Sequence, residues 1–242
     1  MVDGEAAQTA PVKGKNADLP VRAASALVMV AVAGLAFWLG GIWLDLFILA
    51  VAVSTYAEFA RIVAKIDWSS GVKLVAWIAG GAYIALAAYF LIRMAPIETV
   101  LLVVGAVVFV DTFAYFFGRT IGGPKIAPSI SPSKTWAGLL GGIVGATLAL
   151  VLWTEFSSAE AHVSYRPPLE YAALILPGAA IAIAAQTGDF FESWLKRRAG
   201  VKDSSNLIPG HGGVFDRTDG ILPVAILIGL ALTTLAPHWL AG

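Results

Sequence analysis

The chain has 242 residues, of which 58% are hydrophobic and only 13% are charged, and its mean hydropathy is +0.80. A soluble domain carries about 25% charged residues, so these charges are too few to cover a water-facing surface. The formal net charge is zero, which provides no bulk attraction for nucleic acid. There is no cysteine and only three scattered histidines, so a metal ion would need oxygen ligands, as magnesium and similar hard cations prefer.

Residues 1–20 are polar and carry both signs of charge. They lack the basic-then-apolar order of a secretory signal peptide. We expect a flexible polar tail over residues 1–20 and one membrane-embedded domain over residues 21–242.

Long apolar stretches follow this tail. A helix needs about 20 residues to cross a hydrocarbon core roughly 30 Å thick. Seven stretches approach this length: Ala23–Trp43, Leu44–Ala60, Lys73–Ile92, Ile97–Gly118, Thr135–Thr154, Glu170–Gly188 and Gly220–Leu240. The sequence therefore predicts an all-α, polytopic transmembrane protein with about seven spans, and a miscounted helix would make eight or nine.

Two of these spans have features that predict how they pack. Pro177 is expected to kink the sixth span, because proline cannot continue the hydrogen-bond ladder of a helix. The fifth span carries a series of glycines that suits close contact with a neighbouring helix: Gly138, Gly141, Gly142 and Gly145.

Lysine and arginine gather on one side of the predicted spans. The tail and the segments after the second, fourth and sixth spans hold fourteen of the sixteen: Lys13, Lys15, Arg22, Arg61, Lys65, Lys73, Arg119, Lys125, Lys134, Lys196, Arg197, Arg198, Lys202 and Arg217. The other side holds Arg93 and Arg166. Because positive residues accumulate in cytoplasmic loops, we expect a cytoplasmic N-terminus and an external C-terminus. The polar segments 119–134 and 189–219 would then lie together on the cytoplasmic side.

The segment 189–219 combines acidic and basic residues in a way that predicts a metal and phosphate site. Asp189 with Glu192, and Asp216 with Asp219, are spaced so that each pair would share a helix face and hold a divalent cation. Asp189 is expected at the end of the sixth span and Asp216 at the start of the seventh. The run Pro209–Gly213 would expose backbone amides to a phosphate. The alternative is an ordinary solvated loop, although acidic groups at a membrane are costly unless paired or ligated.

The earlier segment 111–136 holds a second set of candidates. Asp111 lies inside the fourth span, where an ionisable group is either functional or a buried partner for a Lys or Arg. Ser133 or Thr135 is expected to cap the fifth span, and a helix N-terminus also attracts a phosphate. A complete nucleotide-binding P-loop pattern is absent from the sequence.

Together these residues resemble a known family, the phosphatidate cytidylyltransferases (CDP-diacylglycerol synthases). The family signature is met at Ser193, Lys196, Arg197, Lys202, Asp203, Pro209, His211, Gly212, Gly213, Asp216, Arg217 and Asp219. Upstream matches are Gln186, Gly188, Asp189, Asp111, Ala114, Tyr115, Gly118, Ser131, Pro132, Lys134, Thr135 and Trp136, with weaker ones at Arg22, Ser25 and Ala26. Phe113, Ser205 and Gly220 depart from the family pattern, which bears on substrate range and rate more than on reaction type.

The resemblance implies that CTP and phosphatidate react to give CDP-diacylglycerol and pyrophosphate with the help of Mg²⁺ or a similar divalent cation. It also implies a multi-pass protein of a bacterial-type inner membrane whose active site faces the cytoplasm, and it allows a homodimer. The expected metal ligands are Asp189, Asp216 and Asp219, with Asp111 and Glu192 as further candidates. The expected catalytic residues are Lys134, Lys196, Arg197, Lys202, Asp203, His211 and Arg217. Ser131, Ser133, Gly212 and Gly213 are the expected nucleotide-binding residues, and His211 has an equally plausible role in holding the glycine-rich turn.

Other classes of function stay open on the sequence alone. A secondary transporter would also be polytopic, but it predicts charges near the midplane in matching halves, and no internal repeat is visible. A CDP-alcohol phosphotransferase would also need acidic metal ligands, but its motif spacing is absent from the sequence. A scaffold without activity would have no use for so many retained carboxylates.

Overall fold

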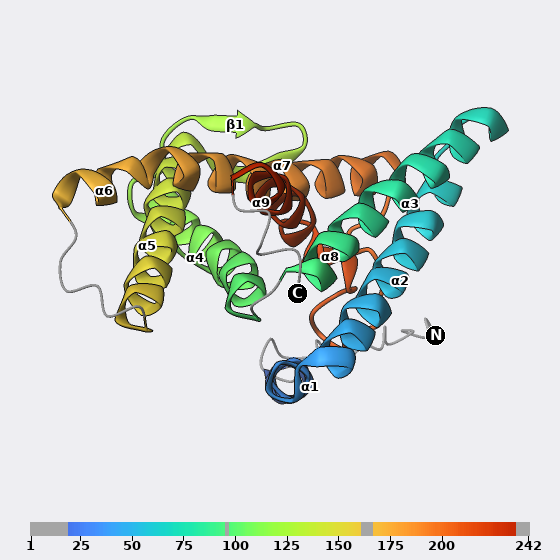
Figure 1. The fold of residues 1–242 in the computed structure, drawn as a ribbon. Helices are drawn as coiled ribbons and strands as arrows, with labels where there is room; N and C mark the ends of the chain where they lie inside the picture. Colours follow the sequence, from blue (N-terminus) through green and yellow to red (C-terminus); the bar gives the residue numbers. More distant parts are fainter. Residues whose placement is uncertain (1–18, 95–96, 161–166, 236–242) are drawn as a thin grey trace, which may run out of the picture.

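The computed structural model describes residues 19–94, 97–160 and 167–235, and it is largely helical (Figure 1). The helices are α1 (Leu19–Leu39), α2 (Gly41–Lys65), α3 (Ser70–Arg93), α4 (Ile97–Thr120), α5 (Trp136–Glu160), α6 (Pro168–Ala173), α7 (Ile175–Arg198), α8 (Phe215–Thr218) and α9 (Ile221–Leu235). Lys13, Lys15, Arg166 and almost all of the predicted tail lie outside the described residues. The described helix α1 begins at Leu19, two residues before the predicted start of the domain.

Six helical stretches are long and apolar enough to cross a membrane: α1 to α5 and the combined stretch Pro168–Arg198. This agrees with a polytopic helical membrane protein. Several predicted ends are wrong: α1 ends at Leu39, before the predicted Trp43, and helices α2, α5 and α7 run on to Lys65, Glu160 and Arg198. Within the described residues α9 has only 15 residues, so the count of seven spans stays a prediction.

The sixth predicted span is interrupted near its start, as Pro177 led us to expect. Helix α6 ends at Ala173 and α7 begins at Ile175. Proline has no N–H and its ring would clash with the carbonyl four residues earlier, which here belongs to Ala173. The break therefore lies one turn before Pro177 itself.

The glycines of α5 allow α4 to approach closely, which confirms the expected packing. A Cβ added at Gly141 would collide with the Phe113 carbonyl and with the Phe117 side chain. One added at Gly145 would collide with the Phe109 carbonyl. On the α7 side, a Cβ at Gly178 would collide with Thr147 of α5. Helices α4, α5 and α7 thus pack without the spacing that larger side chains would impose.

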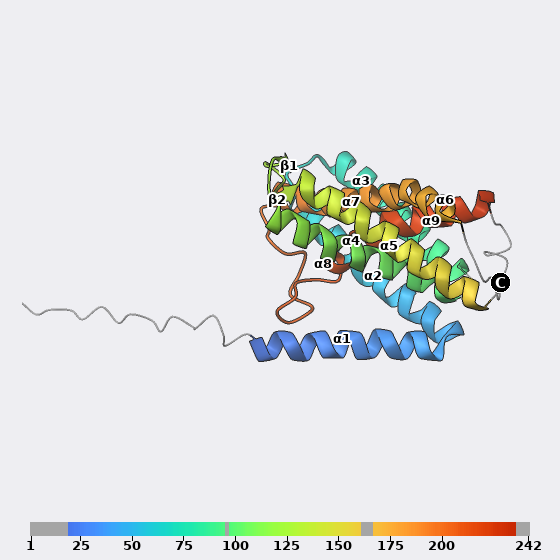
Figure 2. The same cartoon turned by 90° about the vertical axis from the view of Figure 1, so that its left-hand side faces the viewer.

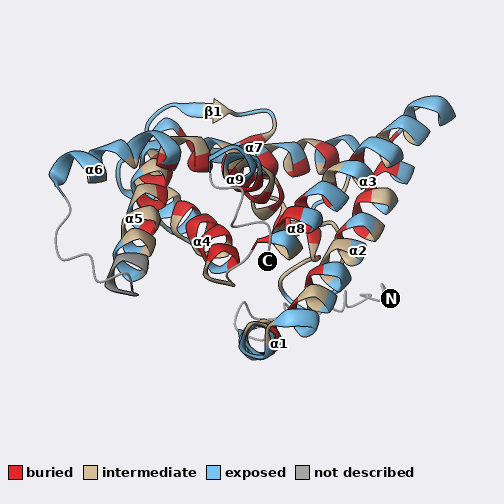
Figure 3. Cartoon of the chain, in the orientation of Figure 1, coloured by how far each residue is buried: buried red, intermediate tan, exposed pale blue. Residues whose placement is uncertain are grey.

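Large apolar side chains cover much of the outer surface, and the buried residues lie where the helices face one another (Figure 3). Trp38 of α1 is 81% exposed and Leu176 of α7 is 79% exposed. A water-soluble protein rarely exposes so much contiguous apolar surface, whereas a bilayer accommodates it without cost. Helix α1 is the most exposed span, with few contacts beyond the start of α2 and the loop after α7.

A short hairpin joins α4 to α5, which the all-α prediction did not include. Strands β1 (Lys125–Ala127) and β2 (Ser131–Thr135) pair antiparallel, with Lys125 opposite Thr135. Thr135 Oγ1 accepts a hydrogen bond of 3.0 Å from the Gly138 amide, which confirms its expected capping of the fifth span. The hairpin and the loop between α7 and α8 lie at the same end of the bundle, as predicted for the two polar segments (Figure 2).

Candidate functional site

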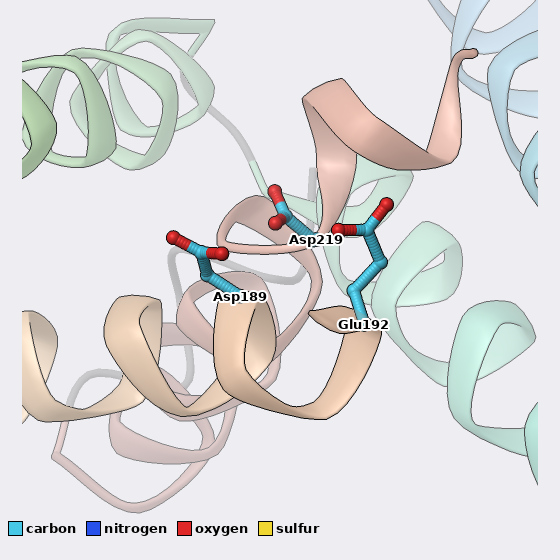
Figure 4. Close-up of side chains that lie close together, drawn as sticks. All are labelled: Asp189, Glu192 and Asp219. Carbon is cyan, nitrogen blue, oxygen red and sulfur yellow. The ribbon is translucent and has the colours of Figure 1, made fainter. Parts of the chain in front are cut away.

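Three carboxylates converge where α7 passes the end of α8 (Figure 4). Asp189 and Glu192 project from the same face of α7, and Asp219 follows α8 directly. One oxygen from each lies within 4.8 Å of the others. Glu192 is only 2% exposed, and its Oε1 has no hydrogen-bond partner among the described residues. We call these three residues the carboxylate cluster.

Glycine at position 188 makes this convergence possible. A Cβ at Gly188 would collide with the Asp219 carbonyl, so the backbone before α9 can contact α7 only because residue 188 has no side chain. Burial and the nearby charge of Asp189 raise the pKa of Asp219 to about 7, although the Gly220 amide donates to its carboxylate at 2.9 Å and lowers it. The cluster therefore concentrates negative charge that neighbouring donors only partly offset.

Asp216 has a different environment from Asp219, despite the matching spacing in the sequence. Its carboxylate accepts hydrogen bonds from Lys196 Nζ at 2.6 Å, the Ser204 amide at 2.9 Å and the Gly213 amide at 2.8 Å. Burial opposes ionisation, but hydrogen bonds from Lys196 and these two amides hold the pKa of Asp216 well below its usual range. Asp216 lies outside the carboxylate cluster and is linked to it through Lys196, which also pairs with Glu192 at 2.7 Å.

Glu58 anchors the loop from α2, a role that our sequence analysis missed. The residue is 1% exposed and accepts hydrogen bonds from the Ser205 hydroxyl at 2.6 Å and from the Val214 and Phe215 amides at 3.1 and 2.8 Å. Ser204 Oγ lies 2.8 Å from both Glu58 and Asp216, so its one proton is shared between them. The available signal was an acidic residue within an apolar helix, which is costly unless it is satisfied.

A pocket of about 320 Å³ adjoins the cluster and brings the two predicted segments together. Its polar lining comes from Asp111 and Arg119 of α4, Ser133 and Lys134 of β2, and Gln186 and Asp189 of α7. Lys134 forms an ion pair with Asp189, and its ammonium lies 5.1 Å from the centre of the Phe190 ring.

Positive and negative groups thus face the same pocket. Asp111 and Lys134, which the sequence placed in one segment, meet Asp189 from the other. Arg119 was counted only for orientation, yet its guanidinium lines the pocket and donates to the Tyr115 hydroxyl at 3.2 Å. A ligand that carries both phosphates and a bound cation matches this distribution of charge.

The glycine-rich turn contacts α1 through Ser25. The Ser25 hydroxyl donates to the Pro209 carbonyl at 2.7 Å and lies 2.9 Å from His211 Nδ1. Arg217 holds the same turn by donating to the His211 carbonyl through two nitrogens, at 3.2 and 2.7 Å. Gly210 has φ of +76°, and a Cβ there would press on the Arg22 side chain. This geometry favours the turn-holding role for His211.

The remaining predicted residues lie around the site rather than in the cluster. Arg197, Lys202 and Asp203 are exposed, and Ser131 is buried in β2. Gly212 has φ of +82°, and a Cβ there would meet Asp216. The Gly213 amide already donates to Asp216. Whether any of these residues contacts a nucleotide stays a prediction.

The fold and the site together define a class: a multi-pass helical membrane protein with a carboxylate- and cation-lined site at one end of its bundle. Residues 68–235 match the model of the cytidylyltransferase family, which is more than half of the chain. The chain belongs to the cytidylyltransferase family.

Curated relatives carry a more specific name. The phosphatidate cytidylyltransferase of Brucella abortus (strain 9-941) is 45% identical over 120 residues, which cover 50% of this chain and 41% of that protein. The phosphatidate cytidylyltransferases of Rickettsia bellii and Rickettsia felis are 44% and 42% identical over 119 and 124 residues, and these matches cover 51% and 54% of the relatives. The chain spans about half the length of the curated relatives it matches.

Proposed function

We propose that this protein transfers the cytidylyl group of CTP to phosphatidate and releases pyrophosphate, with CDP-diacylglycerol as its lipid product. Family membership and the names of the relatives support the class of reaction. The observation that carries the proposal is the carboxylate cluster, in which the buried Glu192 Oε1 has no hydrogen-bond partner among the described residues, beside a pocket lined with cations.

The carboxylate cluster suits a hard divalent cation such as Mg²⁺. All three donors are carboxylate oxygens, which Mg²⁺ prefers, and an unpartnered buried oxygen is costly unless a ligand satisfies it. Asp189, Glu192 and Asp219 would hold the ion, and Asp111 lies across the adjoining pocket from Asp189. When bound, the cation supplies charge neutralisation for phosphate oxygens and the leaving pyrophosphate.

Lys134 and Arg119 would bind the phosphates of CTP. Both line the pocket, and Ser133 beside them offers a hydroxyl donor. Lys134 now pairs with Asp189, so phosphate binding would give it a second anionic partner. Guanidinium and ammonium groups make strong charge-assisted hydrogen bonds to phosphate, and fixed positive groups help two anionic substrates to approach.

Lys196 and Asp216 have a positioning role in this proposal. Lys196 bridges Glu192 to Asp216, and Asp216 in turn holds the loop through Ser204 and Gly213. This arrangement fixes the rotamer of Glu192 so that its other oxygen faces Asp189 and Asp219. Asp216, which the sequence nominated as a metal ligand, thus supports the cluster from outside it.

The reaction needs positioning more than proton transfer. An ionised oxygen of the lipid phosphate attacks the α-phosphorus of CTP, the bond to the β-phosphate oxygen breaks, and pyrophosphate leaves with its electron pair. A phosphate monoester is already ionised near neutral pH, so no strong general base is required. Orientation of the two anions within one pocket accounts for the catalysis that the protein would contribute.

Purified protein tests the proposal directly. Incubation with phosphatidate, Mg²⁺ and each nucleotide in turn should yield CDP-lipid and an equal amount of pyrophosphate with CTP. The Asp189→Asn variant should form neither product, whereas Asp45→Asn, at the start of α2, should match the wild type. Absence of CDP-lipid from folded wild-type protein would rule the proposal out.

We also propose that the site faces the cytoplasm of a bacterial-type inner membrane, as one domain over residues 21–242. The chain has no cysteine, so single cysteines can report the side of each loop. Ser129 in the hairpin and Leu169 in α6 are both exposed and lie at opposite ends of the bundle. An impermeant maleimide should label Leu169→Cys from outside intact spheroplasts and label Ser129→Cys only after lysis; the reverse pattern would invert the proposed orientation.

A further inference from the structure

A second cavity, of about 480 Å³, lies between α3 and α7 with contributions from α2 and α9. We call it the α3–α7 groove. Its lining residues on α3 include Ala76, Ala79, Gly80 and Tyr83, and those on α7 include Gly188, Phe191 and Trp194. Its volume falls in the range of roughly 300–1,000 Å³ that small-molecule sites occupy.

The lining of this groove is apolar. Thr187 donates its hydroxyl to the Ile183 carbonyl of its own helix at 2.7 Å, which leaves the side chain little capacity to bind a polar ligand. The rings of Trp68 and Trp194 lie 6.0 Å apart, and Phe191 stacks on Trp194 at 6.3 Å. Tryptophan gathers at membrane–water interfaces, so this end of the groove matches the headgroup level.

The groove adjoins the carboxylate cluster. Gly188 and Phe191 line it, and they alternate along α7 with Asp189 and Glu192 of the cluster. A Cβ added at Gly188 would collide with the Asp219 carbonyl, so the groove wall at Gly188 contacts a residue of the cluster. A molecule with one apolar and one phosphorylated end could therefore occupy both places.

The groove is also open to the outer surface of the helices. Ala79 and Thr187 are exposed, and Phe191 is 40% exposed. In a bundle of membrane-crossing helices this surface faces lipid, so an acyl chain can enter sideways without passing through water. An apolar chain held there would leave its polar end beside Tyr83 and Asp219.

We propose that the α3–α7 groove binds an acyl chain of the lipid substrate while the lipid phosphate lies at the carboxylate cluster. The inference rests on the proposed function, because it assigns the lipid end of that same reaction. Because the groove contacts one acyl chain, it should also determine which acyl-chain lengths the protein prefers in its lipid substrate. Ala79 lines the open side of the groove, so a larger side chain there should restrict entry from the lipid.

Filling the groove tests the assignment. Ala79→Trp places a large side chain on the lipid-facing side of the groove, and Ala85→Trp adds the same group to an exposed position of α3 outside the lining residues. Gly80 is unsuitable, because a Cβ there collides with Phe59. Rates are measured with dioleoyl and with dihexanoyl phosphatidate in mixed micelles at saturating CTP.

We expect Ala79→Trp to lower kcat/KM for dioleoyl phosphatidate at least about tenfold, as when apolar contacts are lost from a binding pocket. The rate with dihexanoyl phosphatidate should change less than about twofold, and Ala85→Trp should leave both rates unchanged. An unchanged ratio of long- to short-chain rates in active Ala79→Trp would overturn the inference. Failure of the wild type to convert either lipid would instead overturn the proposed function.

Tryptophan fluorescence gives a second test that needs no turnover. Acyl chains brominated near their middle quench indole rings on contact, so a few per cent of brominated phosphatidate without CTP reports binding near Trp68 and Trp194. We expect stronger quenching than with the same amount of brominated phosphatidylcholine, and loss of the difference in Trp68→Phe/Trp194→Phe. The Trp38→Phe control, on exposed α1, should retain the difference. Equal quenching by both lipids would show nonselective lipid contact and contradict the assignment.

Discussion

Two groups of carboxylates lie side by side in this molecule, and their surroundings differ. Glu58 and Asp216 are surrounded by donors: backbone amides of the loop between α7 and α8 and of the start of α8, and the Lys196 ammonium of α7. The carboxylate cluster has three carboxylates that share Lys134, Lys196 and one amide. Within the described part of the chain, one oxygen of Glu192 has no hydrogen-bond partner. Lys196 connects the two groups.

We propose that the difference separates structural acids from functional ones. A buried carboxylate that is fully hydrogen-bonded stabilises the backbone around it, whereas carboxylates that face one another raise the free energy of the folded protein until a cation binds. Sequence spacing alone does not reveal this, because Asp216 and Asp219 look equivalent along the chain. The structure assigns them to different groups.

The largest effect is expected from Asp219→Asn in the carboxylate cluster. Loss of one charge at the metal position should reduce kcat by about 10²–10³-fold or more, the size of loss seen when a charge-stabilising group is removed. Without Mg²⁺ the variant should be at least as stable as the wild type, because one repulsive charge is gone. Assays of CDP-lipid formation and thermal unfolding in detergent provide the two measurements.

Those two measurements together distinguish the groups. Retention of near-normal activity by Asp219→Asn would show that Asp219 is not a metal ligand. Activity lost together with a large fall in Tm would place Asp219 with the structural acids instead.

Glu58→Ala, in contrast, should destabilise the folded protein. It leaves the Val214 and Phe215 amides without their acceptor, and leaving such buried donors unsatisfied should cost about 3 kcal/mol of stability. Glu58→Gln keeps one carbonyl oxygen as an acceptor and should lose less. Thermal unfolding in a fixed detergent measures both, and an unchanged Tm for Glu58→Ala would show that Glu58 does not anchor the loop.

Magnesium should stabilise the folded protein only by binding to the carboxylate cluster. At a concentration one hundred times its Kd, a ligand that binds the folded state alone adds about 2.7 kcal/mol of stability. We expect MgCl₂ to raise the Tm of the wild type and of Asp45→Asn, and to leave that of Glu192→Gln nearly unchanged. NaCl at equal ionic strength controls for screening, and an equal rise with both salts would argue against a specific site.

Much of this arrangement was accessible from the sequence. Apolar run length predicted the helical membrane fold, and i, i+3 spacing placed Asp189 with Glu192 on one helix face, because helix geometry is local. Residues on the same helix face need no long-range information. The glycine series of α5 likewise predicted a close helix contact.

Other features depend on contacts between distant parts of the chain. Glu58 is separated from its partners Ser204 and Phe215 by 146 and 157 residues, so no local pattern identifies these partners. The predicted end of α7 at Gly188 was wrong because hydropathy falls where the polar residues begin, although the helix itself continues to Arg198. The tryptophans of the α3–α7 groove likewise meet only in the folded structure.

The smallest effect is expected where α1 contacts the glycine-rich turn. Ser25→Ala removes the hydrogen bond to the Pro209 carbonyl and the contact with His211, which should cost about 1 kcal/mol, a typical value for one hydrogen bond. That cost corresponds to roughly fivefold faster local opening, so amide hydrogen exchange over residues 208–213 should speed up by about that factor. The matched control is Ser54→Ala, whose hydroxyl donates only within α2. If exchange in the turn stays the same in Ser25→Ala, the turn is held from the Arg217 side alone, and α1 contributes nothing to the order of the site.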